Sequence, residues 1–147
     1  MKSLRDASEN AAVLQRLESL SGDTPPLWGR MDGAQMLAHC QKPLLVAAGE
    51  LTLKRGLIGV LFGRMAKKKF VDSPQAFKPN GPTDPRFLVS DPDDFDAEQE
   101  RLLRLVRRYA DEGPQLDVHP FFGRMSPEDW DHLNWKHLDH HLRQFGA

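Results

Sequence analysis

The stretch that decides the fold lies near the C-terminus and reads Trp135-Lys136-His137-Leu138-Asp139-His140-His141-Leu142-Arg143-Gln144-Phe145. Its apolar residues recur at three- and four-residue spacing, which predicts an amphipathic helix. His137 and His141 are four residues apart, so on this helix they lie on one face, one turn apart. Two imidazoles at that spacing can share a metal ion if a third ligand comes from another element.

The helix that carries these histidines is predicted over residues 126–145. Ser126 is suited to the N-cap position and Pro127 to the first helical position, while Gly146 follows the end. The two histidines lie at the edge of the apolar face, as expected for side chains directed into a helical bundle. The alternative is that they are ordinary histidines on an exposed C-terminal helix, where a protonated imidazole suits the helix dipole.

The rest of the chain predicts further helices over residues 3–21, 32–53 and 95–112. Asp32 with Gln35 three residues later is a capping-box pattern. Arg55 to Phe70 is interpreted as a short helix or turn. Residues 71–95 contain five prolines and predict a long crossover loop, and residues 115–125 predict a second loop. The sequence therefore predicts a single all-α domain over residues 1–147.

The predicted third ligand is His39, beside the apolar stripe of the helix over residues 32–53. His39 lies seven residues beyond its predicted cap, whereas His137 and His141 lie eleven and fifteen beyond theirs. These offsets differ by multiples of four, so the three side chains point in similar directions relative to their helix starts. Pro43 lies inside the same helix, where its missing amide N–H favours a kink.

Composition narrows the class of protein. The net charge of -1 gives no general attraction to nucleic acid or to an anionic membrane, so neither is expected as a partner. The arginines of residues 95–112 are interpreted as a solvated face. The single cysteine, Cys40, excludes an intrachain disulfide and is interpreted as a buried apolar residue. No signal-peptide pattern opens the chain, and the expected location is cytoplasmic.

Three motifs together resemble the DinB/YfiT-like superfamily. They are Trp28-Gly-Arg-Met with Gln35 and His39, then His119-Pro-Phe-Phe-Gly123, then His137-Leu-Asp-His-His141-Leu-Arg-Gln144-Phe. The sequence is most similar to an uncharacterised branch with HPxFG and HLxHHLxQF motifs. The resemblance covers about residues 27–145 and implies a four-helix bundle. It also implies a divalent metal bound by His39, His137 and His141.

The resemblance further implies two kinds of activity on a small electrophilic molecule. One is a thiol-dependent S-transferase with a low-molecular-weight thiol as cosubstrate, and the other is a metal-dependent hydrolase. Imidazole ligands accept Zn, Ni, Fe or Mn, and the sequence does not choose among these metals. The Pro-rich loop over residues 71–95 and the HPxFG element depart from the better-known enzymes of the superfamily, so the substrate stays open.

Supporting roles stay open at this stage. His140 is a candidate proton shuttle or a residue that supports the ligands, and a surface position is the alternative. His119 is a candidate for the mouth of the site, and capping of the last helix is the alternative. Asp139 is expected to face solvent. Candidates for contact with a substrate are Trp28, Trp135 and Arg143, although the two tryptophans also suit a core or interface and Arg143 also suits the surface.

A function of another class is the alternative to an enzyme. The chain would then bind a metal or small ligand without turnover, or serve as a homodimeric module of the stress-response type. In that interpretation residues 56–65 form an exposed apolar docking patch. An open pocket reached by His119 or His140 favours the enzyme, whereas a sealed metal site favours the binding protein.

Overall fold

The structure is a computed structural model that describes residues 1–147, and it is mostly helical, as predicted. Its five α-helices are α1 (Ala7–Glu18), α2 (Gly33–Ala47), α3 (Leu57–Phe70), α4 (Phe95–Glu112) and α5 (Pro127–Gln144). A 3₁₀ turn, η1 (Pro85–Phe87), lies between α3 and α4. Two short strands, β1 (Val118–His119) and β2 (Gly123–Arg124), form an antiparallel hairpin before α5.

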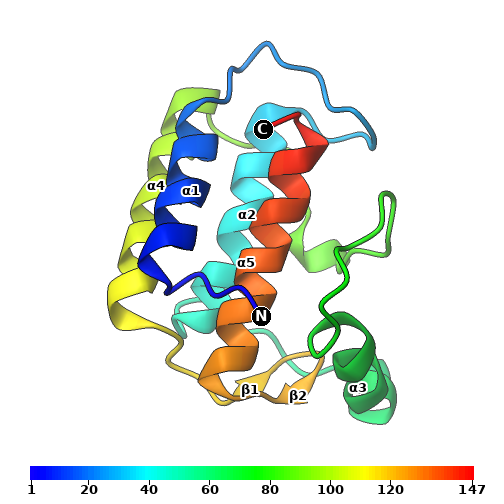
Figure 1. Ribbon diagram of the computed structural model, residues 1–147. Helices are drawn as coiled ribbons and strands as arrows, with labels where there is room; N and C mark the ends of the chain where they lie inside the picture. Colours follow the sequence, from blue (N-terminus) through cyan, green and yellow to red (C-terminus); the bar gives the residue numbers. More distant parts are fainter.

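Four of the helices lie side by side, and the fifth stands apart (Figure 1). Helix α2 packs against α4 and α5, while α1 packs against the same two helices from the other side. Their apolar faces meet in one core that includes Leu17, Leu37, Leu102 and Leu138. Helix α3 contacts the β2 strand at one end of the molecule (Figure 1). No helix here is both long and apolar enough to cross a bilayer.

Side-chain caps set where the long helices begin. Asp32 accepts from the amide of Gln35 and completes the predicted capping box. Ser126 caps α5 in the same way, with Asp129 as the reciprocal partner. Helix α1 begins at Ala7, four residues later than predicted, because Asp6 accepts from two amides of the first turn and acts as its N-cap.

The predicted end of the second helix at residue 53 is wrong, because α2 ends at Ala47. Gly49 follows with φ +74°, a left-handed conformation that commonly terminates a helix and that favours glycine. The helix continues through Pro43 without interruption. Residues 48–53, which were predicted to continue the helix, instead form the connection to α3.

The segment interpreted as a short helix or turn is the 14-residue helix α3. The long loop is present as predicted, although η1 forms within it, capped by Asp84. The second predicted loop contains the β1–β2 hairpin. Helix α4 has the predicted bounds and ends at Gly113, whose φ is +67°.

Candidate metal centre

Three histidines from two helices meet in the interior. Helix α2 supplies His39, and α5 supplies His137 and His141. One potential ligand atom from each lies within 4.8 Å of the other two. The Nε2 atoms of His39 and His137 are 3.0 Å apart. The structure therefore brings together the three residues that the sequence predicted as a set, and we call them the histidine triad.

The triad is enclosed by protein. His39 is 1% exposed and His141 is 6% exposed, while His137 is only partly buried. Burial lowers the pKa of all three imidazoles, that of His141 to about 3, because a charged ring loses its hydration there. The mutual repulsion of neighbouring imidazoles lowers the pKa of His137 and His141 further. All three rings are therefore neutral at pH 7, the state in which imidazole binds a metal.

Two of the three rings are oriented by oxygen acceptors behind them. His39 Nδ1 lies 3.0 Å from the backbone carbonyl oxygen of Phe87 at the end of η1. His141 Nδ1 lies 2.7 Å from the side-chain oxygen of Gln144, three residues later on α5. A carbonyl oxygen can only accept, so Nδ1 carries the hydrogen in both rings. Each Nε2 is then unprotonated and has a free lone pair. The Nε2 atom of His39 is directed toward the His137 ring.

Gln144 is held in turn by the segment before α2. Its Nε2 donates to the carbonyl oxygen of Trp28 over 2.8 Å, and Leu27 N donates to the Gln144 carbonyl oxygen over 2.7 Å. Gly29 has φ +82°, and a Cβ there would lie 2.7 Å from Gln144 Nε2. Glycine at this position therefore leaves room for the amide that orients His141.

His140 lies beside the triad rather than in it. Its ring centroid is 4.9 Å from that of His141, 5.7 Å from Trp28 and 5.9 Å from Phe77 of the Pro-rich loop. Its Nδ1 is buried and has no hydrogen-bond partner. Burial lowers its pKa, which an interaction with the Phe77 backbone opposes. His140 is thus a neutral ring with an unused polar atom next to the triad.

Arg143 and Asp139 are paired with each other. Arg143 Nε donates to Asp139 Oδ2 over 2.9 Å, and Arg16 of α1 donates to Asp139 Oδ1 over the same distance. The expectation that Asp139 faces solvent is therefore wrong, since its side chain is only 16% exposed. One guanidinium nitrogen of Arg143, Nη2, is buried and unpartnered, as is Trp28 Nε1.

His119 and Trp135 lie away from the triad. His119 Nδ1 accepts from the amides of Phe121 and Phe122 over 3.0 and 3.2 Å, so this ring stabilises its own turn rather than capping α5. Its ring packs against Trp130, at the other end of α5 from His141. Trp135 packs under Lys2 near the N-terminus. Cys40 is buried, as predicted.

Two groups that orient the triad were not predicted from the sequence. The Phe87 carbonyl lies in a Pro-rich loop 48 residues from His39, and no local pattern joins them. Gln144 follows His141 by three residues, and this helical spacing is the sequence signal for its role.

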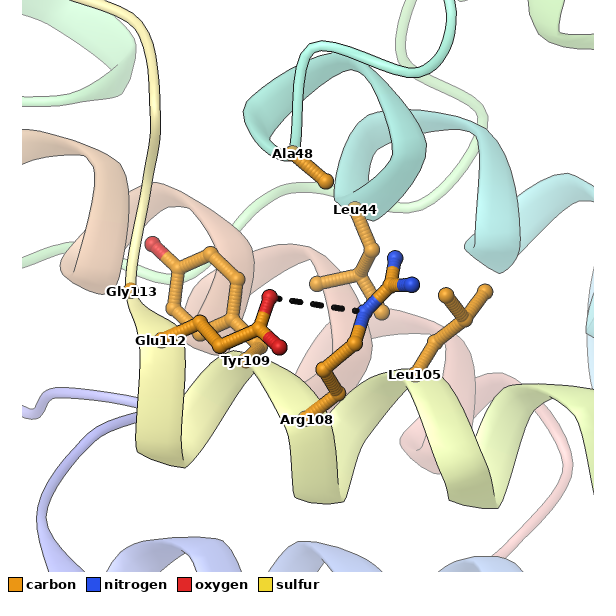
Figure 2. Close-up of a pocket in the computed structure, with 7 residues that line it drawn as sticks. All are labelled: Leu44, Ala48, Leu105, Arg108, Tyr109, Glu112 and Gly113. Carbon is orange, nitrogen blue, oxygen red and sulfur yellow. Dashed lines mark ion pairs between the residues drawn. The ribbon is translucent and has the colours of Figure 1, made fainter.

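Two further hollows on the protein lie elsewhere. Figure 2 shows a pocket between the ends of α2 and α4, in which Arg108 and Glu112 form an ion pair of 3.9 Å. Its volume of about 10 Å³ holds roughly one water molecule. A larger groove follows the arginine face of α4. Each of its arginines pairs with a carboxylate, as expected for a solvated face: Arg101, Arg104, Arg107 and Arg108.

Comparison with curated proteins and with solved structures found no match. A comparison with family profiles matched all of residues 1–147. The chain belongs to the family described as "Protein of unknown function (DUF1569)".

Proposed function

We propose that this protein binds a divalent metal ion through His39, His137 and His141. The observation that carries the proposal is the orientation of the triad. Three neutral imidazoles converge in a buried space, and oxygen acceptors hold the Nδ1 hydrogens of His39 and His141 away from it. Metal-binding histidines in proteins show this same arrangement, in which the second ring nitrogen donates to a carbonyl or carboxylate oxygen.

The spacing and chemistry of the triad fit such an ion. Imidazole nitrogens bind Zn²⁺ at about 2.0–2.1 Å, so two of them on one ion lie at most about 4.2 Å apart. The separation of 3.0 Å between His39 and His137 is within that limit. The largest separation between ligand atoms of the triad is at most 4.8 Å. It must shorten by about half an ångström for all three to bind one ion, and a small rotation of one ring supplies this. No carboxylate belongs to the set, which suits Zn, Ni or Fe better than Mg or Ca.

We also propose that the chain folds as a DinB/YfiT-like four-helix bundle. The side-by-side packing of α1, α2, α4 and α5 supports it (Figure 1), as do the motifs around His39 and His141. A divalent metal held by the three imidazoles would lower the pKa of a bound water or thiol and would polarise a carbonyl group as a Lewis acid. The reaction we propose is transfer of a small thiol to an electrophilic molecule, or hydrolysis of such a molecule.

Two residues near His140 suit recognition of a small substrate with hydrogen-bond acceptors. Trp28 Nε1 and Arg143 Nη2 are buried donors with no partner, and burial of such groups is costly unless a ligand satisfies them. His140 Nδ1 is also buried without a hydrogen-bond partner, and in this proposal it accepts or returns a proton. Phe77 and the Phe87 carbonyl belong to the loop over residues 71–95, which we propose covers the substrate.

A non-catalytic metal-binding protein is the second candidate. The observation in its favour is the deep burial of His39 and His141, since only His137 is partly accessible. A closed site is typical of a structural metal, whereas catalysis requires an open coordination position. The two candidates share the metal and differ in whether the loop over residues 71–95 opens.

The test begins with metal content. We expect the purified chain to carry about one divalent ion, and His39→Gln and His141→Gln to retain less than about a tenth of it. His119→Gln is the matched control, because His119 is equally buried and lies outside the triad. Elemental analysis gives the content, and circular dichroism confirms that each variant is folded. Equal metal in all four proteins would exclude the site.

The second step separates the two candidates. Metal-loaded protein is assayed with thiol cosubstrates and electrophilic acceptors, and with ester and amide substrates. His140→Gln should lower turnover at least about tenfold without changing the metal content, since His140 is not a ligand in the proposal. A folded, metal-loaded protein without turnover in either assay would favour the binding protein.

A further inference from the structure

Helix α3 has an outer face that nothing in the structure covers. Six large apolar side chains on this one helix are 50–73% exposed: Leu57, Ile58, Val60, Leu61, Phe62 and Met65. The other five exposed large apolar residues are distributed over the remaining chain. Apolar residues concentrated in this way mark an interaction surface, whereas single exposed ones are ordinary. We call these six residues the α3 patch.

The packing of α3 explains why the patch points outward. Gly59 and Gly63, one helical turn apart, are the buried residues of α3, and they rest on the backbone of Phe121. A Cβ at Gly59 would lie 3.0 Å from the carbonyl oxygen of Phe121, and one at Gly63 would collide with the same atom. The helix therefore docks through its glycines. This close approach fixes the rotation of α3 and leaves its large side chains on the opposite side.

The charged residues in the sequence around the patch are all basic. From Leu51 to Val71 the sequence contains no aspartate or glutamate and six basic residues: Lys54, Arg55, Arg64, Lys67, Lys68 and Lys69. Lys67 pairs with Asp72 and Asp129 over 2.7 and 3.0 Å. The other five form no ion pair, in contrast to the arginines of α4. The α3 patch is thus rimmed by cations whose charge is not neutralised.

We propose that α3 is an interfacial anchor that inserts its apolar patch into the surface of an anionic lipid membrane. A second copy of the chain is disfavoured as the occupant, because it would bring the five unpaired cations of each copy against one another. A lipid surface accepts exposed leucine and phenylalanine on a projecting helix, while lysine and arginine remain at the anionic headgroups. At 14 residues, α3 is about 21 Å long and lies on such a surface rather than spanning it.

This anchor departs from the expectation, based on net charge, that the protein has no membrane partner. The net charge of -1 averages over the chain, whereas the basic residues of α3 act locally. Screening limits their reach to about 8–10 Å at physiological salt, so distant acidic residues do not cancel them at a surface.

Vesicle cosedimentation of the full chain tests the proposal. The vesicles are phosphatidylcholine alone, or phosphatidylcholine with about a third of the anionic lipid phosphatidylglycerol. We expect binding to be at least about tenfold stronger to the anionic vesicles and to weaken with added salt. Leu61→Glu with Phe62→Glu should abolish binding, and Lys68→Glu with Lys69→Glu should weaken it about tenfold. Leu116→Glu, an exposed apolar residue outside α3, is the control and should bind like the original chain.

Insertion of the patch has its own readout. Phe62→Trp adds a reporter at an exposed position, and its emission should shift to shorter wavelength on anionic vesicles only. No binding of the original chain to anionic vesicles, or unchanged binding of the Leu61 and Phe62 double variant, would overturn the proposal. A concentration-dependent dimer that the double variant converts to a monomer, without lipid binding, would assign the patch to a second copy instead.

Discussion

Gln144 illustrates how one side chain orients a candidate ligand. Its amide oxygen holds His141 Nδ1, and its amide nitrogen is held by the Trp28 carbonyl. The residue is 3% exposed and contacts no other triad member through a hydrogen bond. Its loss would free His141 to rotate or to carry its hydrogen on Nε2, where it blocks metal binding.

We therefore expect Gln144→Leu to weaken metal affinity about 10- to 100-fold while the number of binding sites stays the same. Gln144→Glu keeps an oxygen acceptor for His141 and loses the donation to Trp28, so it should retain most of the affinity at pH 7. Titration of metal-free protein with a competing chelator measures both. Gln15→Leu on the exposed surface of α1 is the control. If Gln144→Leu binds the metal as tightly as the control, Gln144 does not orient His141 for metal binding.

The β1–β2 hairpin is an element that depends on a neutral histidine. His119 Nδ1 accepts from two amides of the turn, so protonation there would remove the acceptor that holds it. Burial lowers the pKa of His119 to about 4, against an ordinary value of 6.5. The unfolded chain therefore binds more protons than the folded one between pH 6.5 and 4, and the free energy of unfolding falls as the pH is lowered through this window.

The expected contribution of His119 is a loss of about 2 kcal/mol between pH 7 and pH 5, and little change above pH 7. His119→Gln should be less stable at pH 7, and its further loss on acidification should be smaller by about that amount. Urea unfolding at the two pH values, with chelator present in every sample, measures the difference. Parallel pH dependence in the two proteins would show that His119 does not titrate as its burial implies.

The helices themselves follow their local sequence closely where a cap is present. Asp32 and Ser126 begin α2 and α5 as predicted, because capping involves residues within one turn of each other. The predicted end of α2 was wrong for a related reason. Apolar residues continue to Leu51 and Leu53, but Gly49 in a left-handed conformation ends the helix first.

At the scale of the whole molecule, a bound metal would join two helices that are far apart in sequence. His39 and His137 are separated by 98 residues, so the ion would bridge α2 and α5 through the core. Because the unfolded chain does not hold the three imidazoles together, metal binding adds directly to the stability of the folded state.

We expect metal at about 100 times its dissociation constant to stabilise the protein by about 2.7 kcal/mol, which raises the melting temperature by about 5–10 °C. Chelator should reverse the shift. His39→Gln should show no shift at the same metal concentration, whereas His119→Gln should show the full one. Thermal unfolding followed by circular dichroism measures all three. A similar shift in His39→Gln would mean that the metal binds elsewhere on the chain.

The sequence by itself determined the starts of α2, α4 and α5, the mostly helical fold and the composition of the triad. Each of these rests on spacing within one or two helical turns, and His39, His137 and His141 followed from their phase relative to two caps. Only the tertiary structure decided which groups surround the triad. Three contacts join segments that are far apart along the chain. They are the hydrogen bond of His39 with the Phe87 carbonyl, the pairing of Asp139 with Arg16, and the packing of the α3 glycines on Phe121. Such contacts depend on how whole elements pack, and local periodicity carries no information about them.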